Sequence, residues 1–201
     1  VFFSVSMSLD GFIAPGSLGE LMGQQWMELQ QWIFPLQFFR ENLKLGEGGE
    51  EGRDNDIVRE TFERTGASVM GKRMFEAGEQ GWPEEAPFHT PVFVVTHEKR
   101  DPWERPGGTT FHFVDGIETA LDQARKAAGD RDLRIAGGGA TILEYVNAGL
   151  IDEFSIALSP VLFGSGIRLF EGVDARRVAL EPVRAEPTRR VTHLTYAVRE
   201  R

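Results

Sequence analysis

The sequence predicts an α/β protein with a central mixed, mostly parallel sheet and an antiparallel hairpin at its C-terminal end. Through most of the 201 residues, short apolar runs typical of buried strands alternate with amphipathic segments of helical period. The C-terminal segment instead holds two strand-like stretches with no helix between them. A chain of this length can bury a substantial core, and we expect residues 1–201 to form a single domain.

The expected strands are apolar runs bounded by turn residues. In the last of them apolar residues alternate with polar ones, as in a hairpin at the edge of a sheet. The runs are residues 1–9, 67–70, 91–96, 109–114, 133–136, 151–160, 178–186 and 191–199.

The expected helices lie between these runs, at residues 57–66, 71–76, 116–130 and 138–150. Residues 20–44 also have roughly helical spacing of aromatic side chains, which Pro35 is expected to interrupt. The glycine-rich, acidic stretch of residues 45–56 reads as a flexible loop.

Both ends of the helix at residues 57–66 carry boundary signals. Asp54, Asn55 and Asp56 are good N-cap residue types immediately before it. Gly66 is expected to end it as the C′ residue.

The composition excludes several functional classes. With no cysteine and four scattered histidines, the chain offers neither disulfides nor the close ligand spacing of a zinc site, and we expect no metal. A net charge of −9 argues against wrapping nucleic acid. No apolar run approaches the roughly 20 residues that a membrane helix needs, and no signal peptide opens the chain, so we expect a cytoplasmic protein.

Polar and glycine-rich turns follow three of the expected strands. Because ligands of open α/β sheets bind outside the carboxyl ends of the strands, these turns are expected to lie at one edge. Basic side chains, a hydroxyl group and a glycine-rich helix start together suit a phosphorylated ligand. The residues are Gly71, Lys72 and Arg73; Thr96, His97, Lys99 and Arg100; and Gly137, Gly138 and Gly139.

Other interpretations of these turns remain open. The glycines can form a plain turn, and the basic side chains can be a solvated surface. Neither common phosphate motif is present: Ile142 occupies the sixth position of a G-x-G-x-x-G pattern begun at Gly137, and no Gly-Lys-Ser/Thr sequence occurs. A nucleotide would therefore be held in some other fold.

Five segments in fixed order resemble the dihydrofolate reductase-like superfamily, and more closely its RibD C-terminal branch, the bifunctional deaminase-reductase domain proteins. The resemblance implies a three-layer α/β/α fold and covers nearly the whole chain, apart from an inserted aromatic and glycine-rich segment at about residues 17–53. The segments are "SVSMSLDGFIA", "VMGKRMFE", "VFVVTH", "IAGGGATI" and "IDEFSIALSPVLFGSGIRLF".

The resemblance implies that NADPH binds across the carboxyl edge of the sheet. Lys72 stands in place of an arginine that reads the 2′-phosphate, and Thr96 and His97 match a strand-end pair that holds the same group. Ala140 replaces an arginine frequent in the folate reductases, which Thr141 is expected to offset. The remaining implied cofactor positions are Gly71, Arg73, Gly137, Gly138 and Gly139, with Ser6, Ile13 and Ala14 meeting the nicotinamide and its carboxamide through their backbone.

The implied substrate side is less complete. Asn55 stands where the folate reductases carry a pterin-binding carboxylate. Asp10 is the candidate catalytic residue and substrate contact, although Asp-Gly is also a common structural turn. Phe163, Gly164 and Gly166 belong to the branch's signature loop, which is expected to bend over the substrate.

Trp26, Trp32 and Phe38 in the inserted segment have two interpretations: an aromatic lid over a planar ligand, or core and dimer-interface residues.

The expected function is NADPH-dependent hydride transfer to a small planar heterocycle, pterin- or pyrimidine-like, or to a related C=N or C=O group. The proton comes from Asp10 or through water. The reductase step of riboflavin biosynthesis is one case, without the deaminase, since its His/Cys zinc motif is absent from the sequence. The alternatives are a non-catalytic NADP(H)-binding or sensor protein and a drug-binding or scaffold dimer. A homodimer is expected, with a small-molecule substrate and neither nucleic acid nor membrane as partner.

Overall fold

The computed structural model describes residues 1–17 and 23–200. The chain divides into two compact units, one formed by Val1–Phe34 and Gly139–Arg201 and the other by Pro35–Gly138. No helix in these described ranges is long and apolar enough to cross a membrane.

The sheet of the Pro35–Gly138 unit is parallel except at one edge. Met70 pairs with Gly137 and Gly71 with Val95, so three neighbouring strands end at the same level. The strand order is β7 (Asp132–Gly137), β3 (Thr65–Gly71), β4 (Val92–Val95), β6 (Thr110–Val114) and the short antiparallel β5 (Trp103–Glu104).

Helices connect these parallel strands. Helix α5 (Ile117–Ala128) packs on β3, β4 and β7, while α4 (Lys72–Glu79) contacts β3 and β4. Helix α3 (Arg53–Arg64) contacts β3 and also α2 (Gln37–Asn42). A short 3₁₀ turn covers Pro106–Gly108.

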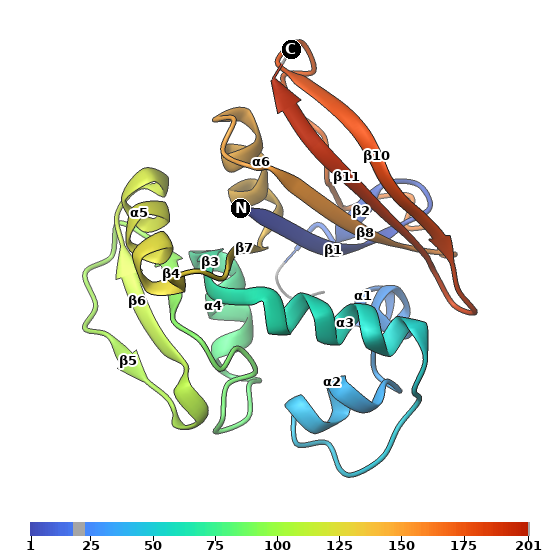
Figure 1. Ribbon diagram of the computed structural model, residues 1–201, viewed down its shortest axis with the longest axis horizontal. Coiled ribbons are helices and arrows are strands. Elements are labelled where there is room, and N and C mark those ends of the chain that lie inside the picture. The colour runs from blue at the N-terminus through green and yellow to red at the C-terminus, as the bar shows by residue number, and fades with distance from the viewer. Residues whose placement is uncertain (18–22, 201) are drawn as a thin grey trace. The chain divides into compact units, whose positions relative to one another are not determined.

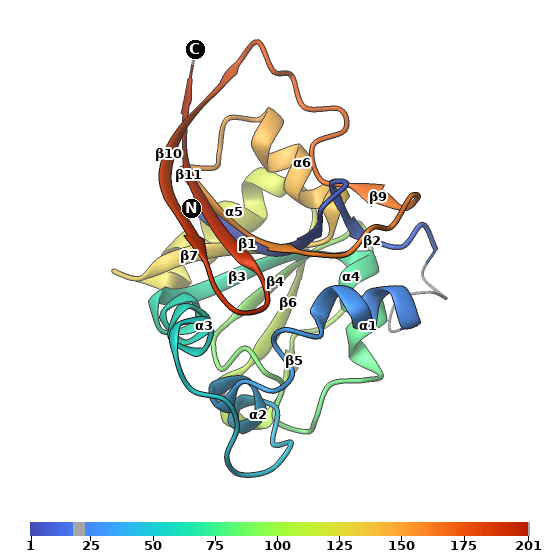
Figure 2. The ribbon, with the colours of Figure 1, turned by 90° about the vertical axis from the view of Figure 1, so that its right-hand side faces the viewer.

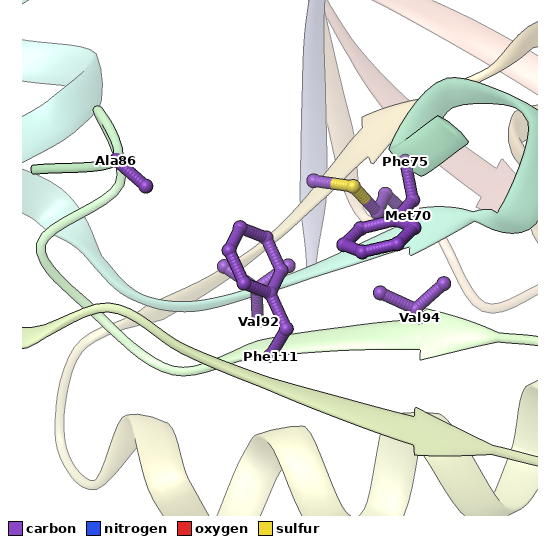
Figure 3. Close-up of a cluster of buried hydrophobic side chains, with 6 residues drawn as sticks. All are labelled: Met70, Phe75, Ala86, Val92, Val94 and Phe111. Carbon is purple, nitrogen blue, oxygen red and sulfur yellow. The ribbon is translucent and has the colours of Figure 1, made fainter. Parts of the chain in front are cut away.

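A buried apolar cluster packs on this sheet (Figure 3). Phe75 of α4 lies edge-on to Phe111 of β6, with ring centroids 5.2 Å apart. Trp82 stacks on the same phenylalanine at 5.2 Å. Burying several large apolar side chains makes the loops that follow β3 and β4 extend from rigid strand ends. The buried residues of the cluster are Met70, Phe75, Ala86, Val92, Val94 and Phe111.

The other unit is mainly antiparallel. Figure 2 shows β10 and β11 as a long, bent hairpin. Strands β1 and β8 pair in parallel, and the stacked rings of Phe3 and Phe154, 5.0 Å apart, join them. The order is β10 (Val178–Pro187), β11 (Thr192–Glu200), β8 (Glu153–Ser159) and β1 (Phe2–Ser8), with β2 (Phe12–Ala14) and β9 (Ile167–Arg168) forming a separate antiparallel pair, and α1 (Gln24–Gln30) and α6 (Gly139–Asn147) as helices.

The predicted mixed α/β class is confirmed, and every expected strand is present (Figure 1). Pro35 lies between α1 and α2, as its helix-breaking chemistry predicts. Residues 18–22 of the predicted insertion at 17–53 lie outside the described residues. The single domain of residues 1–201 stays a prediction.

The predicted start of α3 is wrong, whereas Gly66 stands at C′, directly after the C-cap Thr65, as predicted. The N-cap of α3 is Gly52, with φ of 108°, so Asp54, Asn55 and Asp56 lie inside the first turn rather than capping it. The chain passes directly from α3 into β3 at Thr65, and Gly66 is a strand residue. A Cβ at Gly66 would lie 2.5 Å from the Ala128 carbonyl oxygen, so the close approach of the end of α5 requires glycine there.

Candidate functional site

The predicted phosphate-binding turns of the Pro35–Gly138 unit follow three adjacent strands. Gly71 ends β3 and α4 starts at once with Lys72, so the first backbone N–H groups of that helix lie at the strand end. Thr96 follows β4, and Gly138 follows β7. The structure therefore brings the Gly71–Arg73 turn, the Thr96–His97 turn and Gly137–Gly138 to one edge of the sheet.

The three consecutive glycines have three different surroundings. Gly137 has φ of +132°, and a Cβ there would lie 2.8 Å from Met74 Sδ. A Cβ at Gly139, which begins α6, would meet Ile13 and Ile167, each at 3.0 Å. Gly138 has no protein atom within 4 Å of its Cβ position, and its peptide bond to Gly137 is cis. Of the three, only Gly138 leaves its backbone open to an approaching ligand.

Lys72 links the β3 and β4 turns through an acid. Its Nζ lies 2.8 Å from Glu98 Oε2 and 3.6 Å from Glu76 Oε1. The hydrogen bond to Glu98 raises the pKa of Lys72 and lowers the pKa of Glu98. Because both side chains are largely in contact with solvent, this ion pair is weak enough to be exchanged for another anion.

The side chains of Thr96 and His97, which follow β4, also have hydrogen-bond partners in nearby loops. His97 Nδ1 lies 2.6 Å from Asp115 Oδ1, and both side chains are exposed. The buried Thr96 hydroxyl accepts a hydrogen bond of 3.1 Å from the Glu98 backbone N–H. Arg73 is exposed, and no ion pair to it is found among residues 1–17 and 23–200.

An open pocket of about 350 Å³ lies beside this turn. The Arg100 guanidinium lies 4.7 Å from the Phe113 ring and 5.2 Å from the Phe75 ring, and it is paired with Glu79 at 2.6 Å. The Arg100 cation thus has both aromatic and carboxylate neighbours. The pocket is lined by Thr96, His97, Glu98, Lys99, Arg100, Asp101, Phe113 and Asp115.

In the other unit, Asp10 holds the signature loop. Its carboxylate accepts hydrogen bonds from Ser8 Oγ (2.6 Å), Phe163 N (3.0 Å) and Gly164 N (2.7 Å). These bonds, that from Ser8 first, lower the pKa of Asp10 to about 2, so it is ionised at neutral pH. Asp10 therefore braces the turn at Phe163 and does not carry a proton to donate.

The glycines of this loop allow its bends. Gly164 has φ of +74° and Gly166 has φ of +138°, where a Cβ would lie 2.5 Å from the Ala14 carbonyl oxygen. Phe163 is buried and stacks on Phe12, with centroids 6.4 Å apart. Phe163 thus packs against β2, the strand that carries Ile13 and Ala14.

The Ser6 side chain is committed to a buried network. Its Oγ accepts a hydrogen bond from Trp32 Nε1 (3.0 Å) and donates one to Gln30 Oε1 (2.8 Å). Trp32 is 6% exposed and packs edge-on against His193, so it is a core residue and not a lid. On α6, Ala140 is exposed and Thr141 is buried.

Asn55 also has a structural partner. Its buried side chain accepts a hydrogen bond of 2.8 Å from the Phe38 backbone N–H near the start of α2. Phe38 packs on Phe62, with centroids 5.5 Å apart, while Trp26 lies edge-on to Phe34. The Asn55 side chain therefore positions α2, and no contact of Asn55 favours its predicted substrate role.

Sequence reasoning missed the acids that hold the basic side chains. Glu98 follows β4 whereas its partner Lys72 follows β3. Asp115 follows β6 whereas its partner His97 follows β4. Only the strand order brings each pair together. The role of Ser8 had a visible signal, because Ser-x-Asp is a spacing at which side chains bond within one turn.

Comparison with known proteins places the chain in a family. The RibD C-terminal domain model matches residues 1–194. The uncharacterised protein YyaP of Bacillus subtilis (strain 168) is 36% identical over 62 residues, which span 31% of this chain and 32% of YyaP.

Solved structures share the fold at low identity. A putative riboflavin biosynthesis protein from Shewanella sp. PV-4 has a TM-score of 0.67 at 21% identity over 98% of each chain. Dihydrofolate reductase from Enterococcus faecalis, complexed with NADP(H), gives 0.53 at 15% over 99% of this chain and 95% of that one. Acinetobacter baumannii RibD gives 0.59 at 15% over 98% of this chain and 57% of its own. The predicted dihydrofolate reductase-like fold is confirmed, and the chain belongs to the RibD C-terminal domain family.

Proposed function

We propose that the protein is an NADPH-dependent reductase that transfers a hydride to a C=N or C=O group of a small planar molecule, pterin- or pyrimidine-like. The observation that carries this proposal is the shared edge of β7, β3 and β4, where the open Gly138 backbone lies in the same row as two turns bearing Lys72 and His97. The fold shared with a reductase complexed with NADP(H) supports the same proposal.

The residues present fit a dinucleotide with a 2′-phosphate. Gly138 allows a pyrophosphate to approach the backbone, as its neighbours Gly137 and Gly139 do not. Lys72 and His97 are exposed bases whose present partners are exchangeable carboxylates, and a phosphate dianion is a stronger partner for them than a single carboxylate. When bound, the cofactor supplies the hydride, and the protein aligns and shields the reacting groups.

On the substrate side of the proposed site, Asp10 positions the loop at Phe163 and Gly164. Because its carboxylate is ionised at neutral pH, water is the favoured route for the proton. The carboxylate instead holds Phe163 and Gly164 next to β2, whose Ile13 and Ala14 are the proposed nicotinamide contacts with Ser6.

We also propose that the protein acts as a cytoplasmic homodimer and that the reductase step of riboflavin biosynthesis is one reaction of the proposed class. The second candidate function is a non-catalytic NADP(H)-binding or sensor protein. Asp10 favours this second candidate, since its carboxylate is ionised and already accepts hydrogen bonds from Ser8, Phe163 and Gly164.

Turnover separates the two functions. NADPH oxidation is followed by absorbance with dihydropterins, dihydrofolate and aminopyrimidinones as acceptors. The proposal expects oxidation with at least one of them, and loss of that oxidation in Gly138→Ala. NADPH binding with no oxidation by any acceptor would favour the sensor, and absence of both would reject the two functions together.

A further inference from the structure

The apolar face of the C-terminal hairpin is left partly exposed. In β11 the buried positions include the polar residues His193 and Thr195, while the large apolar residues at the alternate positions are only half-buried. A sheet with one solvated face normally places its polar side chains on that face, so β11 has the reverse arrangement. Its half-buried apolar residues are Leu194, Tyr196 and Val198.

The edge strand β10 extends this apolar face into solvent. Residues directly opposite in an antiparallel pair lie on the same face of the sheet. Leu180 is 47% exposed, and Pro182 and Ala185 are exposed as well. The opposite pairs are Leu180 with Val198, Pro182 with Tyr196, and Ala185 with Leu194. We call these six residues the hairpin patch.

The hairpin patch is continuous with the core of its unit. The Tyr196 ring lies 5.6 Å from the Phe154 ring of β8, measured between centroids. Phe170, which is 41% exposed, lies 5.5 Å from the same Phe154 ring. The apolar face therefore runs without a break from buried β8 to the outer edge of the hairpin, where it has no cover.

An added strand does not fit this edge. Strand β10 is the outermost strand of its sheet. Pro182 and Pro187 have no N–H group to donate to a neighbouring strand, and a bulge between Pro182 and Arg184 interrupts the register. A partner of this hairpin therefore has to lie on its face rather than extend its edge.

The charge pattern favours a second copy of this chain as that partner. With a net charge of −9, two copies repel one another over most of their surfaces. The six residues of the hairpin patch are uncharged, whereas the charged residues of β10 pair with the other face of β11. Two acidic chains can therefore approach most closely at this patch. The charged β10 residues are Glu181, Arg184 and Glu186.

The area of the patch suits a reversible dimer. Strand β10 has ten residues, so the patch is about 33 Å long and, across two strands, about 10 Å wide, or about 330 Å². An interface at the lower end of the stable range buries about 600 Å² of each partner, of which about 57%, or 340 Å², is apolar. One patch on each copy supplies that apolar centre.

We propose that the hairpin patch is the contact surface of a homodimer, in which the patches of two copies pack face to face across a two-fold axis. Such an interface uses the same surface on both copies, and packed sheets lie about 10 Å apart. This proposal rests on the homodimer proposed above and not on the reductase activity.

The mass of the particle tests the proposal. By analytical ultracentrifugation, we expect the wild type to pass from monomer to dimer between about 1 and 100 µM. Leu180→Glu places a carboxylate in the contact on each copy and should weaken dimerisation by about a hundredfold or more. Leu45→Glu is the matched control, because Leu45 is 52% exposed and lies in the Pro35–Gly138 unit; it should dimerise as the wild type does.

A second variant separates burial of a charge from repulsion between acidic chains. Ala185→Arg, on the same face, introduces the opposite charge and should also be monomeric. Circular dichroism melts establish that each variant is folded, and Ala185→Arg carries the test should Leu180→Glu not fold. A wild type that is monomeric throughout this range, or a dimer that persists in either folded variant, would overturn the proposal. Because mass is measured and not turnover, loss of the proposed reductase activity leaves this test intact.

Discussion

Gly138 differs from the glycines on either side because nothing in the protein occupies the space beside it. Gly137 is fixed by its positive φ and by Met74, and Gly139 by Ile13 and Ile167, so both are explained by the fold alone. No such contact explains Gly138, and we propose that a ligand approaches its backbone closely.

The Gly138→Ala variant tests whether a ligand approaches the backbone at this position. The added methyl group meets no protein atom, so the unfolding midpoint should stay within about 2 °C, while NADPH affinity should fall by about tenfold or more, a loss of about 1.4 kcal/mol. Calorimetric titration and thermal melts measure the two quantities. Gly81→Ala, whose nearest contact is 3.9 Å away, is the control. Equal NADPH affinity in Gly138→Ala and wild type would contradict the proposed cofactor contact.

Glu98 competes with the proposed cofactor phosphate for Lys72. Replacing it by glutamine removes a carboxylate 2.8 Å from the lysine, so Glu98→Gln should bind NADPH several-fold more tightly and leave NADH affinity nearly unchanged. Both affinities are measured by fluorescence quenching. Asp122→Asn makes the same charge change on the exposed face of α5 and should leave both unchanged. A parallel gain for NADH would show that Lys72 does not read the 2′-phosphate.

Asp10 makes a pH-dependent contribution to stability. Its folded-state pKa is depressed to about 2, so its contribution is present above the unfolded pKa of about 3.9 and is lost as the pH falls through 2. Asp10→Asn should therefore melt several degrees below wild type at pH 7, with the difference shrinking between about pH 4 and pH 2. Circular dichroism melts at a series of pH values follow this. A difference independent of pH would mean that the loop is not held by the Asp10 charge.

At the scale of elements, β3 shows how a single glycine sets the distance between a strand and a helix. Ala128 at the end of α5 lies so close to Gly66 that a Cβ would meet its carbonyl oxygen at 2.5 Å and its Cα at 2.9 Å. Backbone atoms cannot move aside as a flexible side chain can.

The Gly66→Ala variant should therefore destabilise the fold by about 1–3 kcal/mol, measured by urea unfolding. Gly81→Ala, with open space around it, should cost far less. A Gly66→Ala variant as stable as wild type would show that α5 tolerates a larger separation from β3.

Strands β3 and β4 could be predicted from the sequence because they are buried on both faces and read as apolar runs. The break at Pro35 was predictable because proline chemistry is local. The start of α3 was not, since its N-cap is Gly52 and the three residues read as caps, Asp54, Asn55 and Asp56, lie inside the helix. The pairing of β2 with β9 was not predictable, because strands of three and two residues show no hydrophobic period.

The positions of the basic turns and glycines of the candidate site could also be predicted from the sequence, but their partners could not. Its basic turns and glycines each follow a strand in the sequence, and parallel strand order then aligns them at one edge. The partners that restrain them, Glu98 and Asp115, are set by contacts between loops and leave no pattern in the sequence.

At the scale of the whole molecule, the charge distribution supports the proposed ligand. The chain carries a net charge of −9, yet Lys72, Arg73, His97, Lys99 and Arg100 follow two adjacent strand ends. The RibD C-terminal domain match over residues 1–194 includes both of these turns. Because Lys72, His97 and Arg100 are each paired with a carboxylate, an anionic ligand at this edge has to replace these acids as partner.

The most direct test is a calorimetric titration of the purified protein with NADPH and then with NADH. We expect micromolar binding of NADPH, with NADH about tenfold weaker or more, and a Lys72→Met variant in which this preference is largely lost. Failure of both dinucleotides to bind would mean that the turns after β3, β4 and β7 are not a cofactor site.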